Sequence, residues 1–273
     1  MVDRLAPPQV MGILNITPDS FSDGGRFLAL DAAWHQVQRL IAEGADIIDI
    51  GGESTRPAAQ PVSVAEELDR IMPVLEKIRQ EWPILISVDT SKAEVMREAI
   101  AAGVDIINDV RALRNDGSLA AVASANQVRI CLMHMQGEPR TMQQNPRYDN
   151  VVNEVKTFLL ERVQACLAAG ISPNRLWLDP GFGFGKTVEH NLLLLKHLAV
   201  LTQLGYPLVV GVSRKSFLGQ LLNKPVTERL YAGLALAVLA VGQGAQIIRT
   251  HDVAATVDAL RVTHAVLQLT DKV

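Results

Sequence analysis

Polar side chains stand at the ends of successive apolar runs in this chain, and their chemistry differs from run to run. Carboxylates only accept hydrogen bonds, whereas amides also donate them, so Asp and Asn together suit a heterocycle with several N–H groups. Arg249 and His251, together with Arg56 elsewhere in the chain, suit an anion such as a phosphate or diphosphate. The strand-end set comprises Asn15, Asp49, Asp89, Asn108, Asp179, Lys215, Arg249 and His251.

Each of these residues has an ordinary explanation when it is taken alone. A single Asp at the end of a strand is often a helix N-cap, and a single Arg or Lys is usually a solvated surface charge. Eight such residues at the same end of successive strands favour a binding site instead. Asn15 adds an oxygen of the kind that Mg²⁺ prefers, because this ion takes oxygen ligands and keeps waters and phosphates.

A short phrase occurs three times, as GADIID at 44–49, GVDIIN at 103–108 and GAQIIR at 244–249. Its glycine suits the end of a helix, and its β-branched pair suits a buried strand. The apolar part is repeated while the last residue changes from an acid to an amide to a base. This pattern is typical of a barrel that carries its chemistry on one rim.

Short apolar runs alternate with helical patterns along the chain, which predicts a parallel sheet. Eight such units favour a (β/α)8 TIM barrel over an open doubly wound sheet, with residues 1–273 as a single domain. Ser63 with Glu66 and Ser91 with Glu94 predict two capping boxes. The expected strands are 10–15, 47–51, 84–89, 106–110, 129–135, 176–179, 208–213 and 247–251. The expected helices are 31–43, 63–81, 91–102, 117–125, 148–169, 188–204, 227–241 and 253–269.

Bulk composition narrows the class of protein. The net charge of −3 gives no general attraction to nucleic acid or to acidic membranes, and the longest uncharged apolar stretch, 230–242, is too short to span a bilayer. Cys131 and Cys166 form neither a disulfide framework nor a metal-binding spacing, and we expect buried thiols in a reducing compartment. Since the first residues also carry no apolar signal core, we expect a cytoplasmic protein.

Three connections, 16–30, 52–62 and 136–147, are unusually long and belong on the carboxyl rim of the expected barrel. The glycine-rich segment 181–186 lacks the spacing of a Walker phosphate loop, and we expect it to present Phe184 to a pocket. His134 is expected to pack behind the barrel, while its neighbour Met133 lines the pocket.

Several long segments resemble the signatures of the dihydropteroate synthase family. They are MGILNITPDSFSDGG at 11–25, GGESTRP at 51–57, DPGFGFGK at 179–186, SRKS at 213–216 and RTHD at 249–252. The resemblance implies a TIM-barrel transferase of folate biosynthesis that is a target of sulfonamides. Its reaction joins p-aminobenzoate to 6-hydroxymethyl-7,8-dihydropterin diphosphate and yields 7,8-dihydropteroate and diphosphate.

The resemblance also implies a role for individual residues. The pterin would be held by Asp89, Asn108, Met133, Asp179, Lys215 and Arg249, with the guanidinium of Arg249 stacked on its face. The diphosphate would be bound by Asn15 with Mg²⁺ and by Arg56, Arg249 and His251. The p-aminobenzoate would contact Thr55, Pro57, Phe184, Ser213 and Lys215. The reacting centre would be covered by the first loop, and its catalytic residues would be Asp19, Phe21, Asp23 and Lys215.

Three other functions remain open at this stage. A pterin-binding methyltransferase domain would share the pterin-binding acids and Asn108, but it would not need the segments TPDSF at 17–21, STRP at 54–57 and SRKS at 213–216. A non-catalytic pterin-binding module would tolerate the loss of Asn15, Arg56 or His251, and all three are present. A Schiff-base aldolase would use Lys215 in an apolar surrounding, and the neighbouring Arg214 argues against it.

The segment 227–241 is apolar on every side, although an outer helix of a barrel needs only one apolar stripe. Its remaining face, extended by 253–269, would be an exposed apolar patch of the kind that marks a contact surface. We expect a twofold homodimer through these two helices, which the family resemblance also implies. The alternative is that flanking segments of the same chain cover the patch.

Overall fold

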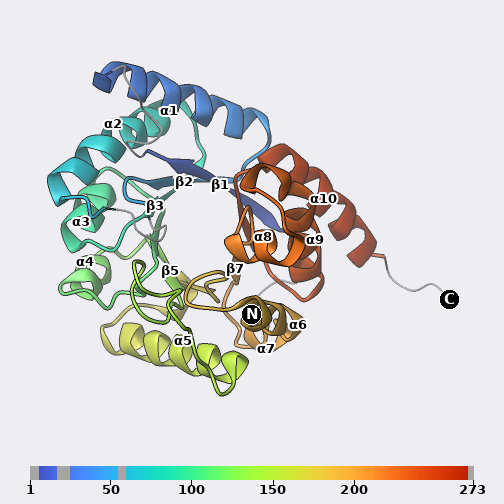
Figure 1. The fold of residues 1–273 in the computed structure, drawn as a ribbon. Coiled ribbons are helices and arrows are strands. Elements are labelled where there is room, and N and C mark those ends of the chain that lie inside the picture. Colours follow the sequence, from blue (N-terminus) through green and yellow to red (C-terminus); the bar gives the residue numbers. More distant parts are fainter. Residues whose placement is uncertain (1–5, 17–24, 55–59, 270–273) are drawn as a thin grey trace.

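Eight parallel strands form a barrel that is surrounded by helices (Figure 1). The computed structural model describes residues 6–16, 25–54 and 60–269. Neighbouring strands follow the order β6-β5-β4-β3-β2-β1-β8-β7, and a bridge between Leu178 and Leu208 joins the two ends of this order. The expected TIM barrel is therefore confirmed. The strands are β1 (Gln9–Asn15), β2 (Ile47–Gly51), β3 (Leu85–Asp89), β4 (Ile106–Asp109), β5 (Arg129–Met133), β6 (Leu176–Asp179), β7 (Val209–Val210) and β8 (Ile247–Thr250).

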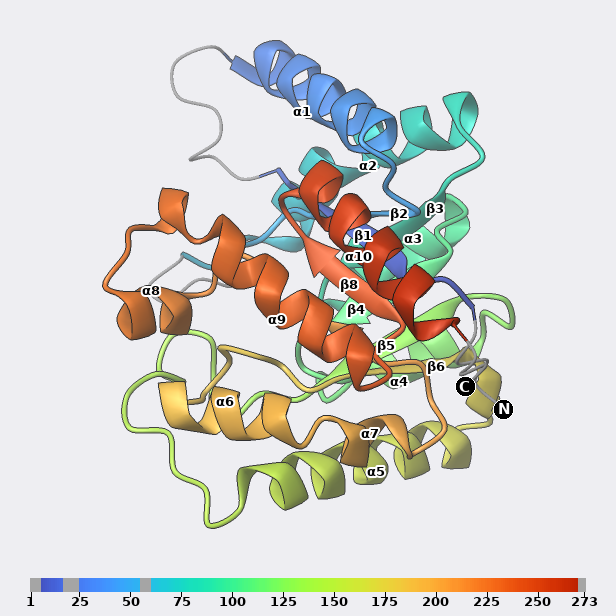
Figure 2. The ribbon, with the colours of Figure 1, turned by 90° about the vertical axis from the view of Figure 1, so that its right-hand side faces the viewer.

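The outer layer consists of helices that mostly follow the strand preceding them. They are α1 (Gly25–Ala42), α2 (Val64–Glu81), α3 (Ala93–Ala101), α4 (Ser118–Ala123), α5 (Val151–Ala168), α6 (Val188–Lys196), α7 (Ala199–Thr202), α8 (Ser216–Leu222), α9 (Leu230–Gly242) and α10 (Val253–Leu267). Figure 2 shows α9 and α10 side by side on the outside of β8. Within the described ranges, no helix combines the length and the apolar character that crossing a bilayer requires.

The repeated phrase has a simple packing explanation. The first isoleucine of each copy points into the barrel, where Ile47, Ile106 and Ile247 belong to one buried cluster. The second isoleucine of each copy points outward and packs in the larger cluster between the strands and the helices. The glycine that opens each copy follows a helix and has a positive φ, as at Gly44 with φ +93°.

Side chains that point into the barrel change from apolar to polar along the strands. Alternate residues share a face, so the inward position after each isoleucine is the last residue of the phrase. Ile47 is followed by Asp49, and Ile106 is followed by Asn108. The apolar floor of the barrel therefore supports a polar layer at the carboxyl ends of the strands. The floor consists of Met11, Ile47, Ile106, Cys131, Trp177, Val209 and Ile247.

The helix expected at 188–204 is interrupted, and a side chain from another segment explains the break. α6 ends at Lys196 and α7 begins at Ala199. The amide of Gln243 donates to the carbonyl of Leu195 at 2.6 Å and accepts from the N–H of Ala199 at 3.3 Å. Because Gln243 satisfies backbone groups that a continuous helix would pair internally, the chain can turn at this point.

The region after β7 also departs from expectation. The strand expected at 208–213 is reduced to Val209–Val210, and the helix α8 follows without having been expected. Arg214 adopts a left-handed backbone with φ 57°, which turns the chain from the strand into α8. The helix expected at 227–241 begins only at Leu230, after a short 3-10 turn at Val226–Glu228.

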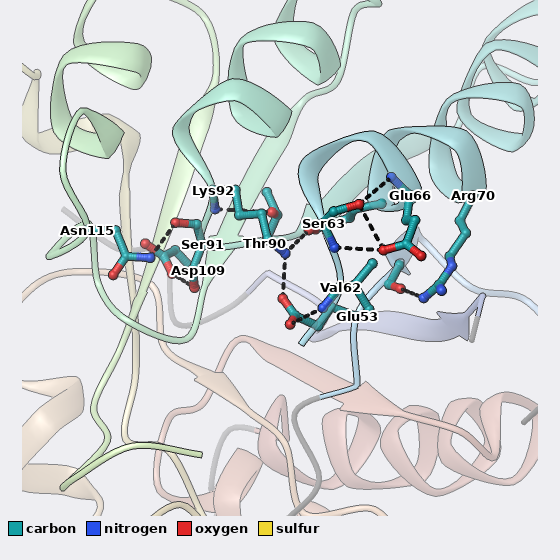
Figure 3. Close-up of polar contacts among 12 residues, drawn as sticks. Glu53, Val62, Ser63, Glu66, Arg70, Thr90, Ser91, Lys92, Asp109 and Asn115 are labelled. Carbon is teal, nitrogen blue, oxygen red and sulfur yellow. Dashed lines mark hydrogen bonds and ion pairs between the residues drawn. The ribbon is translucent and has the colours of Figure 1, made fainter. Parts of the chain in front are cut away.

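One of the two expected capping boxes is confirmed and the other is wrong. The hydroxyl of Ser63 accepts from the N–H of Glu66 at 3.2 Å, and the Glu66 carboxylate accepts from the N–H of Ser63 at 2.9 Å (Figure 3). At the start of α3 the N-cap is Lys92, and it makes no side-chain cap bond. The hydroxyl of Ser91 donates instead to the buried carboxylate of Asp109 on β4, a long-range partner that the local sequence does not reveal.

Candidate active site

A polar pocket lies at the carboxyl ends of the strands and is lined by all six residues predicted to bind a pterin. Asp89 comes from β3, Asn108 from β4 and Met133 from β5. The remaining wall comes from β6, from β8 and from the segments that follow β4, β6 and β7. The lining residues are Asp89, Asn108, Val110, Met133, Asp179, Gly181, Phe182, Phe184, Gly211, Lys215 and Arg249.

The guanidinium of Arg249 lies between two carboxylates at the bottom of this pocket. Its Nε lies 2.6 Å from Oδ2 of Asp49, and its Nη2 lies 2.9 Å from Oδ2 of Asp89. Burial opposes the charge of Arg249, but the two carboxylates hold its pKa above the ordinary value. Arg249 is therefore fixed as a cation whose position is set by β2 and β3.

Asp49 has no role in the expected site, although it stands among the strand-end residues. It is fully buried, and it also accepts from the amide of Asn108 at 3.3 Å. Asp49 thus orients two of the residues that line the pocket. The sequence signal was its place as the last residue of the repeated phrase, where the equivalent positions hold Asn108 and Arg249.

Asp89 and Asp49 both pair with Arg249, and the pKa of Asp89 is raised at this buried position. Burial raises the pKa of Asp89 from 3.8 to about 7, against the favourable charge of Arg249, while Asp49 and other acids raise it further. A carboxyl group with a pKa near neutrality can accept or donate a hydrogen bond to a heterocycle, depending on pH.

Asp179 and Lys215 face the pocket from β6 and from the start of α8. The Oδ1 of Asp179 accepts from the N–H of Gly181 at 2.7 Å, while burial raises the pKa of this carboxyl group. Burial and the nearby Arg249 lower the pKa of Lys215 to about 8, and Asp179 and Asp89 oppose that shift. The Nζ of Lys215 lies 4.2 Å from the ring centroid of Phe184, a cation–π contact.

The expected contact of Phe184 with the pocket is therefore confirmed, and so is the expected packing of His134. The His134 side chain is buried and its ring packs edge-on against Phe158 with centroids 4.9 Å apart. Met133, one residue earlier, lines the pocket. The two neighbours lie on opposite faces of β5 and its extension, as alternation predicts.

Ser213 and His251 form a second polar pair beside the pocket. The hydroxyl of Ser213 accepts from the backbone N–H of His251 at 3.2 Å and lies 3.0 Å from its Nδ1. The hydroxyl and Nδ1 thus share a hydrogen bond whose donor depends on the tautomer of the imidazole. Burial lowers the pKa of His251 to about 3, with Arg249 and Arg214 adding to the effect. Without an anion beside it, His251 is a neutral imidazole that can still donate one hydrogen bond.

Asn15 ends β1 with an exposed side chain, and its Oδ1 lies beside Gly51 at the end of β2. Among the described residues, no group of three or more His, Cys, Asp or Glu side chains could hold a metal. One amide oxygen cannot form a complete metal cage. It fits an Mg²⁺ ion whose other ligands are water and diphosphate oxygens, which is how this ion usually binds.

Six of the expected site residues lie outside the described residues. These are Asp19, Phe21 and Asp23 in the first loop and Thr55, Arg56 and Pro57 in the second. The base of the second loop is described, and Figure 3 shows how it is held. The Glu53 carboxylate accepts from the N–H of Val62 at 3.1 Å and from Lys92 Nζ at 2.6 Å. Lys92 also pairs with the buried Glu67, so the two ends of the loop are tied to α2 and α3.

A TIM barrel with carboxylates, an amide and two cations in one rim pocket defines a class of enzymes that bind polar heterocycles. The model of the pterin binding enzyme family matches residues 11–251. Residues outside this match lie only at the two ends of the chain.

Individual relatives narrow this class. The dihydropteroate synthase of Haemophilus influenzae is 54% identical over 261 residues, which cover 96% of this chain and 94% of that protein. The Yersinia pestis dihydropteroate synthase, solved with a sulfonamide drug complex, has a TM-score of 0.92 and 52% identity over 97% of this chain and 96% of that one. The Xanthomonas albilineans enzyme, solved with 4-aminobenzoic acid, has a TM-score of 0.91 and 50% identity over 97% and 95%. The chain belongs to the dihydropteroate synthase family.

Proposed function

We propose that this protein is an enzyme that makes 7,8-dihydropteroate from 6-hydroxymethyl-7,8-dihydropterin diphosphate and p-aminobenzoate, with release of diphosphate. The observation that carries the proposal is the rim pocket in which Asp89, Asn108, Asp179, Lys215 and Arg249 meet. Family membership over nearly the whole chain favours this reaction over the methyltransferase, the binding module and the aldolase.

The pterin lies among the carboxylates and the amide. Its ring N–H and amino groups donate to Asp89 and Asp179, and its carbonyl accepts from the ammonium of Lys215, so donors and acceptors are matched. Asn108, held by its bond to Asp49, can donate and accept at the remaining edge. Met133 supplies an apolar surface, and the planar guanidinium of Arg249 covers one ring face.

The diphosphate is placed where Asn15 at the end of β1, Arg249 of β8 and His251 just after β8 could bind it. Arg56 of the second loop adds a further cation to this group. A Mg²⁺ ion held by Asn15 would neutralise part of the charge that grows on the leaving group. An incoming anion would also favour the protonated form of His251, which is neutral without it.

The p-aminobenzoate is placed against Phe184 and Lys215, with Ser213 beside them and with Thr55 and Pro57 of the second loop completing the site. The ring of Phe184 offers an aromatic surface, and the ammonium of Lys215 offers a partner for the carboxylate. This substrate is proposed to lie above the pterin because Lys215 borders both positions.

The bond between the pterin methylene carbon and the diphosphate oxygen breaks, and its electron pair leaves with the diphosphate. The electron-rich pterin stabilises the resulting carbocation, and the nitrogen lone pair of p-aminobenzoate then forms the new C–N bond. The proton lost from that nitrogen passes to water or diphosphate, so no strong general base is needed. Asp19 and Asp23 are proposed to stabilise the cation, and Phe21 to exclude water, the competing nucleophile.

The direct test of this function is diphosphate release in the presence of Mg²⁺, measured with and without p-aminobenzoate. We expect release that depends on p-aminobenzoate and is inhibited by a sulfonamide. Release at the same rate without p-aminobenzoate would indicate a hydrolase and contradict the proposal. Methyl transfer from a methylated tetrahydrofolate would favour the methyltransferase alternative.

The proposal includes a homodimer and a cytoplasmic site of action. The side chains of Tyr231 and Leu239 on α9 are 79% and 55% exposed, and those of Val262 and Val266 on α10 are 66% and 62% exposed. Exposed apolar side chains on two neighbouring helices often meet a partner, and a second copy of the chain is the simplest one. Cys131 and Cys166 are buried free thiols, as expected for a reducing compartment.

A further inference from the structure

A buried lysine lies directly behind the pterin pocket and has no part in the proposed reaction. Lys186 follows the glycine-rich segment after β6, and its side chain is only 3% exposed. Its Nζ donates to the carbonyl of Gly181 at 2.8 Å and to that of Phe184 at 3.1 Å. A third contact, at 2.9 Å, joins Nζ to Nδ1 of His134. Three acceptors match the three N–H donors of an ammonium group.

His134 is suited to be the third acceptor. Burial lowers the pKa of this imidazole to about 2, and the neighbouring Lys186 and Arg114 lower it as well. The ring is therefore neutral and can offer the Nδ1 lone pair to the ammonium. Among the hydrogen bonds of the described residues, the two carbonyls and this nitrogen are the acceptors that Lys186 contacts.

The segment 181–185, which Lys186 contacts, packs closely against the backbone of His134 and Gln136. Gly181 has φ +68°, and a Cβ at this position would lie 1.8 Å from the carbonyl oxygen of His134. A Cβ at Gly185 would lie 2.4 Å from the carbonyl oxygen of Gln136. The hydroxyl of Tyr148 also donates to the carbonyl of Gly185 at 2.8 Å. Together with the two bonds from Lys186, the segment is therefore held at the carbonyls of Gly181, Phe184 and Gly185.

This backbone carries two contacts of the active site. The N–H of Gly181 donates to Asp179, and the ring of Phe184 lies under Lys215. Lys186 bonds the carbonyls of these same two residues, Gly181 and Phe184. A change at Lys186 is therefore passed to the pterin-binding carboxylate through Gly181 and to the proposed aminobenzoate surface through Phe184.

Lys186 also acts on Asp179 through its charge. Burial raises the pKa of Asp179, and Lys215, Arg249 and Lys186 all lower it. The other titratable group facing Asp179 is Cys131 on β5, whose pKa burial and Asp179 raise, so this thiol stays neutral. In the reverse direction, burial lowers the pKa of Lys186 to about 7, while Asp179 opposes and Lys215 adds to the shift.

We propose that Lys186 is a positioning residue of the pterin site, which fixes the 181–185 segment through three hydrogen bonds and supplies a cation behind Asp179. This inference rests on the proposed function, since it assigns Asp179 to the pterin. Removal of the Lys186 charge should raise the pKa of Asp179. Loss of its hydrogen bonds should also leave the N–H of Gly181, which donates to Asp179, less firmly positioned. Pterin binding that needs the carboxylate would then be lost at a higher pH than in the wild type.

The test uses Lys186→Met, which keeps an unbranched side chain one heavy atom shorter and removes the charge and the donors. The dissociation constant of 7,8-dihydropteroate is measured by calorimetry from about pH 5 to about pH 9 for this variant and the wild type. We expect the variant to bind about tenfold more weakly than the wild type near neutral pH. The acid limb, which is the loss of affinity as the pH falls, should shift upward by about one pH unit. The matched control is Tyr148→Phe, which removes a hydrogen bond from the same segment without changing charge, and its acid limb should stay in place.

Each outcome decides the question. A Lys186→Met protein that is folded by its melting curve and has the wild-type affinity and acid limb overturns the inference, as does an equal shift in Tyr148→Phe. If Lys186→Met does not fold, Lys186→Gln replaces it, because Gln retains two donors and should keep the segment while still shifting the acid limb. The wild type supplies a further measurement, since by reciprocity the ligand must raise the pKa of Lys186. An unchanged titration of its Cε resonance on ligand binding contradicts the inference, whereas absence of ligand binding by the wild type contradicts the proposed function instead.

Discussion

Arg249 of β8 and Asp49 of β2 form a buried ion pair with a distance of 2.6 Å between Nε and Oδ2, although 200 residues separate them in the chain. The pair fixes the cation that closes the bottom of the pterin pocket. Asp49 is fully buried, so the pair is shielded from water. Removal of one member of a buried pair leaves the other uncompensated in a poorly hydrated site.

Asp49→Asn should therefore be both less stable and less active. We expect the free energy of unfolding, measured in urea, to fall by about 3 kcal/mol, because Arg249 then keeps only its longer ion pair with Asp89. The matched control is Glu228→Gln, which removes an exposed pair with Lys224 at 4.0 Å and should change stability by less than about 1 kcal/mol. Equal losses in the two variants would show that burial of the Arg249 pair has no special effect.

Asp179→Ala should weaken pterin binding strongly. The substitution removes the acceptor that faces the pterin and leaves polar ligand atoms without a partner, which corresponds to about a hundredfold loss of affinity. Calorimetry with 7,8-dihydropteroate measures this change directly. Unchanged affinity in a folded variant would be incompatible with the proposed position of the pterin.

The expected strands and most of the site follow from local signals. Asn108 shares a strand face with Ile106, and Asp179 shares one with Trp177, because side chains alternate along a strand. Only the positions of the strands are needed for this prediction. The Arg249–Asp49 pair and the contact of Lys186 with His134 could not be predicted, because they depend on how distant segments meet. The break between α6 and α7 depends in the same way on Gln243, which lies beyond both helices in the sequence.

The stability of the protein should depend on the protonation of Asp89. Its pKa is raised from the ordinary value of 3.8 to about 7 in the folded protein, so the folded state takes up a proton more readily than the unfolded chain. The contribution of this group to stability is thus fully present below about pH 4 and is lost as the pH rises through about 7. Asp89→Asn should remove this loss, so the melting temperature of the variant relative to the wild type should be higher at pH 8 than at pH 5. A difference that is the same at both pH values would contradict the raised pKa.

The first loop should matter for turnover more than for holding the pterin. Replacement of both Phe21 and Asp23 by Ala should lower kcat/KM for the condensation and leave the affinity for 7,8-dihydropterin compounds nearly unchanged, because the loop would close only over a loaded site. Steady-state kinetics and calorimetry on the same preparation separate the two effects. Full activity of the double variant would remove the proposed role of this loop.

The exposed faces of α9 and α10 should hold two copies of the chain together. The wild type is expected to sediment at about twice the chain mass of 29.7 kDa. Leu239→Glu with Val262→Glu would place charges on this apolar surface and should produce monomers, whereas a Glu at the exposed Val226, on another segment, should leave the dimer intact. A wild type that stays monomeric at micromolar concentration would contradict this interface.

One pocket at the carboxyl rim is expected to join a pterin to an aromatic amine. Mass spectrometry of the product formed from 6-hydroxymethyl-7,8-dihydropterin diphosphate and p-aminobenzoate, with Mg²⁺ present, measures this reaction itself. We predict that the wild type forms 7,8-dihydropteroate in equal amount to the diphosphate released, and that Asp179→Ala forms almost none. Diphosphate release that yields only the hydrolysed pterin alcohol, or product formation that Asp179→Ala leaves intact, would contradict the account.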